Sequence, residues 1–295
     1  LEHQLQDVVD EIRNNYSNCR VFNLSLGNAD NKVFELRKQY NLAVLLDELS
    51  KDYNLIFTVS AGNNTTYNTD NYPSYFFENI PDYKIIDPAS AALAITVGSI
   101  SHNFGGAFQR EYEMGDLFDI PAKHYFPSPF TCIGPGFNGI IKPELVEFGG
   151  TVITNRFMRN NNIAGKLLSL NKNFVAEAKL FTADIGTSMA CPKVANQLAT
   201  IINKYPDKSN NMIKALLLSS AKIPNERPPE YNDITKSSSD IKLQPLLNVY
   251  GFGLPSINEA LESDNDKVLL LRENRIGLNR VQLYSIELPS TLFTT

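Results

Sequence analysis

A serine that could act as a nucleophile lies just before a helical pattern, in the string Ile185-Gly186-Thr187-Ser188-Met189-Ala190-Cys191-Pro192. The glycine lets the backbone turn tightly, and an apolar run from Val194 to Ile202 follows. Ser188 is therefore expected in the first turn of a helix, where free N–H groups and the helix dipole favour an anion. Such a position suits a nucleophile that forms a tetrahedral oxyanion. Taken alone, Gly-Thr-Ser more often indicates a serine that caps a helix.

A second polar side chain, Asn63, follows a short apolar segment. Residues 55–59 are apolar apart from one threonine and are mostly β-branched or aromatic, and Ser60-Ala61-Gly62-Asn63-Asn64 ends the run. An oxyanion needs a preorganised hydrogen-bond donor, which an Asn amide on a fixed turn supplies. The alternative is a turn asparagine that tolerates a left-handed backbone.

The elements that must position these residues alternate between helix and strand. Apolar residues recur at helical spacing in residues 5–16, strand-like segments cover Val21–Leu26, Leu55–Ser60 and Ala94–Ser99, and a second helical pattern takes in Val33, Leu36, Tyr40, Ala43 and Val44. This order predicts a parallel sheet with helical crossovers. Ligands bind at the carboxyl ends of such strands, so we expect Gly27, Asn63 and Ser188 to gather at one edge of the sheet.

Three strings together resemble the subtilisin-like serine proteases (subtilases). Gly-Thr-Ser-Met-Ala-x-Pro around Ser188 is similar to the nucleophile motif of that family, and Ala-Gly-Asn ending at Asn63 is similar to its oxyanion-hole segment. Residues 23–27, Asn-Leu-Ser-Leu-Gly, resemble the strand that binds substrate. No Gly-x-Ser-x-Gly elbow surrounds Ser188, which argues against an α/β-hydrolase esterase.

The resemblance implies an α/β fold: a three-layer subtilisin-like domain with a parallel central sheet, truncated at its N-terminus. Residues 1–262 would be the C-terminal two-thirds of the catalytic domain. Residues 263–295 would begin a β-rich C-terminal segment, because Val268 to Leu271 and Val281 to Ile286 look strand-like.

The resemblance also implies a serine endopeptidase that forms an acyl-enzyme on Ser188, with Asn63 in the oxyanion hole. Substrate would add to the sheet as a β-strand. The pocket for the side chain before the scissile bond would be walled by two short strings: Ser25, Leu26 and Gly27, and Ser60, Ala61 and Gly62.

The aspartate and histidine of a Ser-His-Asp triad have no counterpart in the motifs of this chain. In subtilases both precede the helix that corresponds here to residues 5–16, and the histidine opens a helix as His-Gly-Thr. His3, His102 and His124 do not lie in such a string. We therefore expect a piece of an active protease that is inactive by itself. The alternative is a non-catalytic pseudoprotease or peptide-binding scaffold.

Composition restricts the partners and the compartment. The 295 residues carry 27 basic and 32 acidic side chains, a net charge of −5, which does not indicate a nucleic-acid or membrane-surface protein. No apolar run approaches the ~20 residues of a membrane span. Cys19, Cys132 and Cys191 are odd in number and widely spaced, which argues against a disulfide framework or zinc site and favours a reducing compartment, the cytoplasm.

Other expectations come from the resemblance alone. Four segments resemble those of intracellular bacterial subtilases encoded beside AAA-type ATPases: residues 23–27, 128–130 with 133–136, 141–145 and 251–255. This resemblance suggests an ATPase partner in addition to a peptide or protein substrate. Calcium binding is possible by family resemblance, but no oxygen cage can be named, and no cofactor or metal motif is identified.

Overall fold

The structure is a computed structural model that describes residues 1–33, 38–102, 118–119, 122–155, 165–234, 239–263 and 269–285. The chain divides into two compact units, Leu1–Glu262 and Ser263–Thr295.

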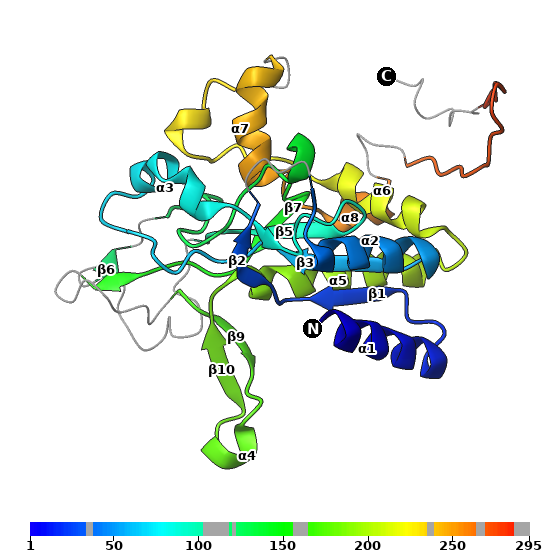
Figure 1. Cartoon of the computed structure of the whole chain (residues 1–295). Coiled ribbons are helices and arrows are strands. Elements are labelled where there is room, and N and C mark those ends of the chain that lie inside the picture. Colours follow the sequence, from blue (N-terminus) through cyan, green and yellow to red (C-terminus); the bar gives the residue numbers. More distant parts are fainter. Residues whose placement is uncertain are drawn as a thin grey trace. The chain divides into compact units, whose positions relative to one another are not determined.

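The first unit is built on a four-stranded parallel sheet (Figure 1). Its strands lie in the order β1 (Val21–Leu24), β3 (Ile56–Ser60), β5 (Ile95–Ile100) and β7 (Leu145–Phe148). Strands β3 and β5 are buried along their whole length, which explains their nearly continuous apolar sequences. The predicted α/β fold with a parallel central sheet is confirmed.

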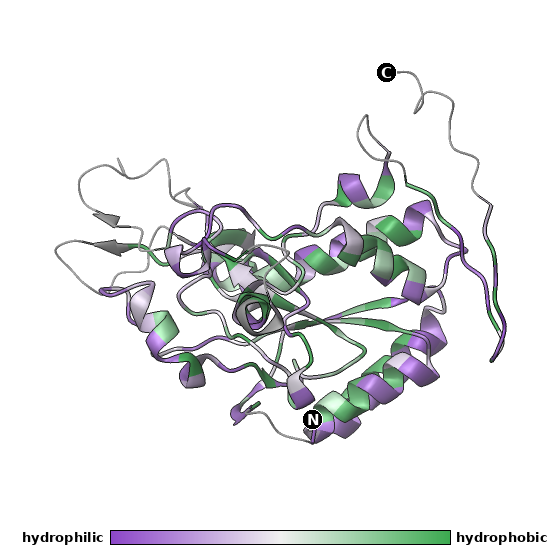
Figure 2. Ribbon diagram, turned by 90° about the horizontal axis from the view of Figure 1, so that it is seen from above, coloured by the Kyte–Doolittle hydropathy of each residue, from purple (hydrophilic) through white to green (hydrophobic). Residues whose placement is uncertain are grey.

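Helices cover both faces of this sheet. Helix α5 (Thr187–Lys204) contacts all four strands, and α6 (Asn210–Ser220) and α8 (Ile257–Leu261) pack against it. On the other face, Phe57 and Val59 of β3 share a core with α1 (Glu2–Asn15) and α2 (Asn41–Asp52), because alternate residues of a strand point to opposite faces. Figure 2 shows the hydrophobic strands lying between helices that alternate hydrophobic and hydrophilic residues.

Smaller elements surround this framework. Strand β2 (Asn28–Lys32) pairs antiparallel with β4 (Ile86–Asp87). The other paired strands are β6 (Phe118–Asp119) with β8 (Thr154–Asn155), and β9 (Leu167–Leu170) with β10 (Phe181–Asp184). The remaining helices are α3 (Ser74–Glu78), α4 (Phe174–Glu177) and α7 (Asp240–Tyr250), and the 3₁₀ turns are Ile80–Tyr83, Phe137–Gly139 and Pro229–Tyr231. Across the described ranges, no helix has the length and apolar character needed to span a bilayer.

The second helix begins later than its sequence pattern predicts. The pattern starts at Val33, whereas α2 begins at Asn41. Val33 follows β2 instead, donates its N–H to the carbonyl of Ile85 at 2.9 Å and is buried in the core. Its apolar side chain therefore belongs to an extended segment, while Leu36 lies outside the described residues.

The second unit has no regular element in its described residues, 263 and 269–285. Leu278, Val281 and Leu283 are almost fully exposed. An alternating apolar pattern makes a stable strand only when it pairs with others in a sheet, and no strand pairs with this segment within the described part. Val268 and Ile286, which delimit the strand-like pattern, lie outside the described residues.

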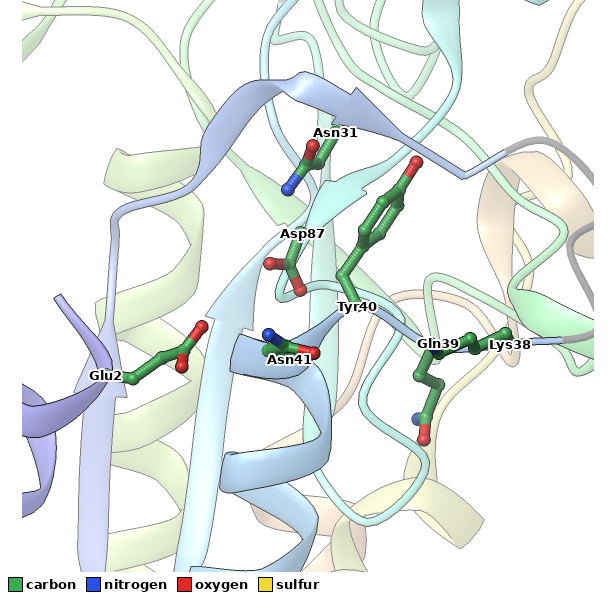
Figure 3. A pocket seen from close by; sticks show the side chains of 7 residues that line it. All are labelled: Glu2, Asn31, Lys38, Gln39, Tyr40, Asn41 and Asp87. Carbon is green, nitrogen blue, oxygen red and sulfur yellow. The ribbon is translucent and has the colours of Figure 1, made fainter.

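A buried carboxylate, Asp87, joins β4 to the start of α2. Its Oδ1 accepts a hydrogen bond from the N–H of Ala43 at 3.1 Å, which satisfies one free donor of the helix N-terminus. It lines a cavity of about 350 Å³ whose other lining residues are Glu2, Asn31, Lys38, Gln39, Tyr40 and Asn41 (Figure 3). Burial is the main reason that the pKa of Asp87 is raised from 3.8 to about 6, and the Glu2 carboxylate contributes to the same shift.

The raised pKa of Asp87 predicts a pH-dependent stability. The folded protein binds the Asp87 proton more tightly than the unfolded chain, so this residue stabilises the fold less as the pH rises from 3.8 to about 6. An Asp87→Asn variant keeps the acceptor for Ala43 and lacks the titration. We expect the free energy of unfolding of the unchanged protein, relative to that of the variant, to decrease across this range in urea titrations. A constant difference would contradict the prediction.

Candidate active site

The turn before α5 requires a glycine. Gly186 has φ of +150°, which favours glycine, and a Cβ atom there would lie 3.2 Å from Nδ2 of Asn63. Its N–H donates to the carbonyl of Gly149 at 2.9 Å, so the turn is attached to the end of β7. Ser188 is consequently the second residue of α5 and is partly exposed, with its backbone N–H among the free donors of the first helical turn.

Asn63 and Thr187 join the end of β3 to the start of α5. The Oδ1 atom of Asn63 accepts hydrogen bonds from the Thr187 N–H at 2.9 Å and from the Thr187 hydroxyl at 3.2 Å. The N–H of Gly62 also lies 3.2 Å from the Thr187 hydroxyl oxygen. With Oδ1 engaged, the Nδ2 group of Asn63 is the end of the amide left to donate to another acceptor.

Ser25 and Ser188 make two contacts across the end of β1. The Ser188 hydroxyl lies 3.5 Å from the carbonyl oxygen of Ser25, its acceptor, and the Ser25 hydroxyl donates to the carbonyl of Ser188 at 3.4 Å. Pro192 explains the second contact: in an α-helix the carbonyl of residue 188 accepts from the N–H of residue 192, which proline lacks. Ser25 therefore supplies a donor that the helix cannot.

The two strings predicted to bind substrate lie side by side. Strands β1 and β3 pair in register up to Leu24 and Val59, so residues 25–27 and 60–62 continue from adjacent parallel strands. The Ser188 turn contacts both strings, through Ser25 and through Gly62. The structure thus brings Ser188, Asn63 and the two strings together at the carboxyl edge of the sheet. Thr187 and Pro192 belong to the motif around Ser188, but the sequence assigned no contact to either. A proline as the sixth residue of a helix does indicate a carbonyl that lacks its helical donor.

Other side chains that could act as a nucleophile or a base are buried or lie against an aromatic ring. Burial raises the pKa of the Cys132 and Cys191 thiols to about 12, which keeps both protonated and poorly nucleophilic. The imidazoles of His102 and His124 lie against the ring of Phe148, with centroid distances of 6.3 and 5.5 Å. Across the residues with described positions, no three His, Cys, Asp or Glu side chains cluster so as to hold a metal ion.

Comparison with known proteins places this chain among the subtilases. The model of the subtilase family (Peptidase_S8) matches residues 2–253. A protein of Sinorhizobium fredii (strain NBRC 101917 / NGR234), "Uncharacterized protein y4bN", is 32% identical over 97% of this chain, which spans 66% of that protein's length.

Two solved structures are similar to this chain at low sequence identity, and the first of them shows the same fold. The prenylagaramide maturation protease PagA superimposes with a TM-score of 0.52 and 16% identity, over 88% of this chain and 66% of that one. The epidermin leader peptide processing serine protease EpiP of Staphylococcus aureus gives a TM-score of 0.47 and 18% identity, over 85% of this chain and 52% of that one.

Substitutions of Asn63 should show whether its Oδ1 atom stabilises the turn before α5. Asn63→Ala removes the acceptor of the Thr187 N–H, and we expect a loss of about 1 kcal/mol in the free energy of unfolding. Asn63→Asp keeps the acceptor at a helix N-terminus, where a negative charge is favourable, and should retain the stability of the unchanged chain. Urea denaturation measures both variants; equal losses in Asn63→Ala and Asn63→Asp would show that Oδ1 does not hold the turn.

Proposed function

Because this chain belongs to the subtilase family, we propose that it is a serine endopeptidase that hydrolyses peptide bonds through an acyl-enzyme on Ser188. Asn63 is the proposed side-chain donor of the oxyanion hole. One observation carries the proposal: the Ser188 turn is hydrogen-bonded to the ends of both β1 and β3, where a peptide would lie.

The proposed reaction begins with attack of the Ser188 oxygen on the carbonyl carbon of the substrate. The C=O π electrons move to oxygen, and the hydroxyl proton passes to a base. The Ser188 N–H and the Asn63 Nδ2 group then donate to the oxyanion. Collapse of the intermediate breaks the C–N bond, and the amine leaves with the proton. Water then attacks the ester carbonyl and gives a proton to the base, and collapse of this second intermediate breaks the bond to the Ser188 oxygen, which regains the proton as the acid is released.

The base is the component that the described contacts do not supply. The Ser188 hydroxyl is placed to donate to a backbone carbonyl, that of Ser25, and the rings of His102 and His124 lie against Phe148. We propose that the base and its carboxylate partner lie outside residues 1–295. The competing proposal is a scaffold that binds peptides at the same edge and leaves them intact.

The partners follow from the proposed reaction. The substrate is a peptide or protein whose main chain lies along residues 25–27 and 60–62. A cytoplasmic location agrees with three free thiols, at Cys19, Cys132 and Cys191. An ATPase partner rests on sequence resemblance alone.

A serine-directed probe separates the protease from the scaffold. We expect a fluorophosphonate to leave residues 1–295 nearly unlabelled, because Ser188 is a weak nucleophile without a base. Any residues that the gene encodes upstream of Leu1 should be added and the labelling repeated, with Ser188→Ala in the longer protein as the control. The protease proposal expects label on the longer protein and none on the control.

Two outcomes would change the assignment. Strong, Ser188-dependent labelling of residues 1–295 would place the base within this chain, with His102 and His124 the first to be substituted. Absence of label on every form, with peptide binding retained, would favour the scaffold over the protease.

A further inference from the structure

The hairpin that precedes α5 has one apolar face. Strands β9 and β10 pair antiparallel, with Leu170 opposite Phe181 and Leu168 opposite Ala183. Residues directly opposite each other in such a pair lie on the same face, so these four side chains share a face of the hairpin. Leu168, Leu170 and Phe181 are each more than half exposed. The apolar face of the hairpin is therefore largely uncovered.

The tip of the hairpin continues this face. Leu170 also lines a hollow of about 400 Å³ together with Phe174 and Leu180. Val175, the neighbour of Phe174 in α4, is 81% exposed. The hairpin and α4 extend away from the central sheet (Figure 1). The name apolar arm is used below for the six large apolar residues of this hairpin that are more than half exposed: Leu168, Leu170, Phe174, Val175, Leu180 and Phe181.

Hydrogen bonds at the tip hold the arm in a defined shape. Asn171 is buried, and its Nδ2 group donates to Oε2 of Glu177 at 2.9 Å and to the carbonyl of Lys179 at 3.0 Å. Its Oδ1 atom accepts from the N–H of Asn173 at 2.9 Å. One buried amide thus joins both ends of the turn, so the apolar side chains around it are presented in a fixed arrangement.

The strand edges of the arm are open to a further strand. Among the residues with described positions, β9 and β10 pair only with each other. Proteins usually protect such edges with lysine, proline or a bulge. Residues 167–170 and 181–184 contain no lysine or proline, and their pairing has no register shift. Because a two-stranded hairpin is only marginally stable by itself, an arm of this kind is expected to pair with another surface.

A second copy of this chain fits the arm. Large apolar side chains present roughly 150–200 Å² each when fully exposed, so the arm presents on the order of 600 Å². Two arms that cover each other bury about 1,200 Å², the lower end of the range for specific interfaces. A two-fold axis pairs identical edges antiparallel and lets Val175 of each arm meet the hollow of the other. A membrane surface is a poorer match, because the chain has a net charge of −5.

We propose that the chain forms two-fold dimers in which the apolar arms of two copies cover each other. The arm leads through residues 185–187 directly to Ser188. The dimer therefore anchors the segment that enters the turn before α5. The inference goes beyond the proposed function and does not depend on it, because the contact forms whether or not Ser188 is a nucleophile.

Sedimentation equilibrium of the whole chain tests the dimer. We expect a monomer–dimer equilibrium at micromolar concentrations. The double variant Leu170→Gln with Val175→Gln places polar groups in the contact and should raise the dissociation constant at least about 10-fold. The matched control, Ser169→Gln with Thr182→Gln, places the same groups on the opposite face of the hairpin and should leave the constant within about threefold. All four positions are on the surface, and thermal melting establishes that both variants are folded.

Hydrogen exchange locates the contact. Backbone amides of residues 167–170 and 181–184 should exchange more slowly in the dimer than in the Leu170→Gln, Val175→Gln variant. A chain that stays monomeric, equal dissociation constants for the two double variants, or a dimer whose added protection lies outside the hairpin would overturn the inference. Binding of the monomer to phosphatidylcholine vesicles through the arm would also overturn it and would assign the arm to a lipid surface.

Discussion

The hydrogen bonds between Thr187 and Asn63 are the constraint on which the rest of the site depends. They attach the first residue of α5 to the loop after β3, so a helix that crosses all four strands begins at one fixed point. The residue before it is a glycine with φ of +150°, a conformation that favours glycine, and a Cβ atom there would also crowd the same Asn63 amide. These contacts therefore fix the position of Ser188, which follows one residue later.

Further contacts link the Ser188 turn to residues 25–27 and 60–62, the two proposed walls of a substrate pocket. Pro192 leaves the Ser188 carbonyl without a helical donor, and Ser25 of the first wall takes that place. Gly62 of the second wall lies within hydrogen-bond distance of the Thr187 hydroxyl.

The framework of the fold could be predicted from sequence, because its signals are local. The apolar, β-branched segments near residues 21, 55 and 94 are strands of a parallel sheet, and Gly-Thr-Ser before an apolar run marks the start of α5. The predicted start of α2 was wrong because the Val33 N–H is hydrogen-bonded to the carbonyl of Ile85, a residue distant in sequence. The sequence also carries no information on which end of the Asn63 amide holds the turn.

The central claim is that Ser188 and Asn63 form one preorganised site for an oxyanion. A crystal structure of the protein after reaction with a fluorophosphonate, in whichever form is labelled, tests it most directly. The account predicts phosphorus bonded to the Ser188 oxygen, with the phosphoryl oxygen about 2.7–3.1 Å from both the Ser188 N–H nitrogen and Nδ2 of Asn63. A phosphoryl oxygen directed away from Asn63, or an unmodified Ser188 in an inhibited protein, would contradict it.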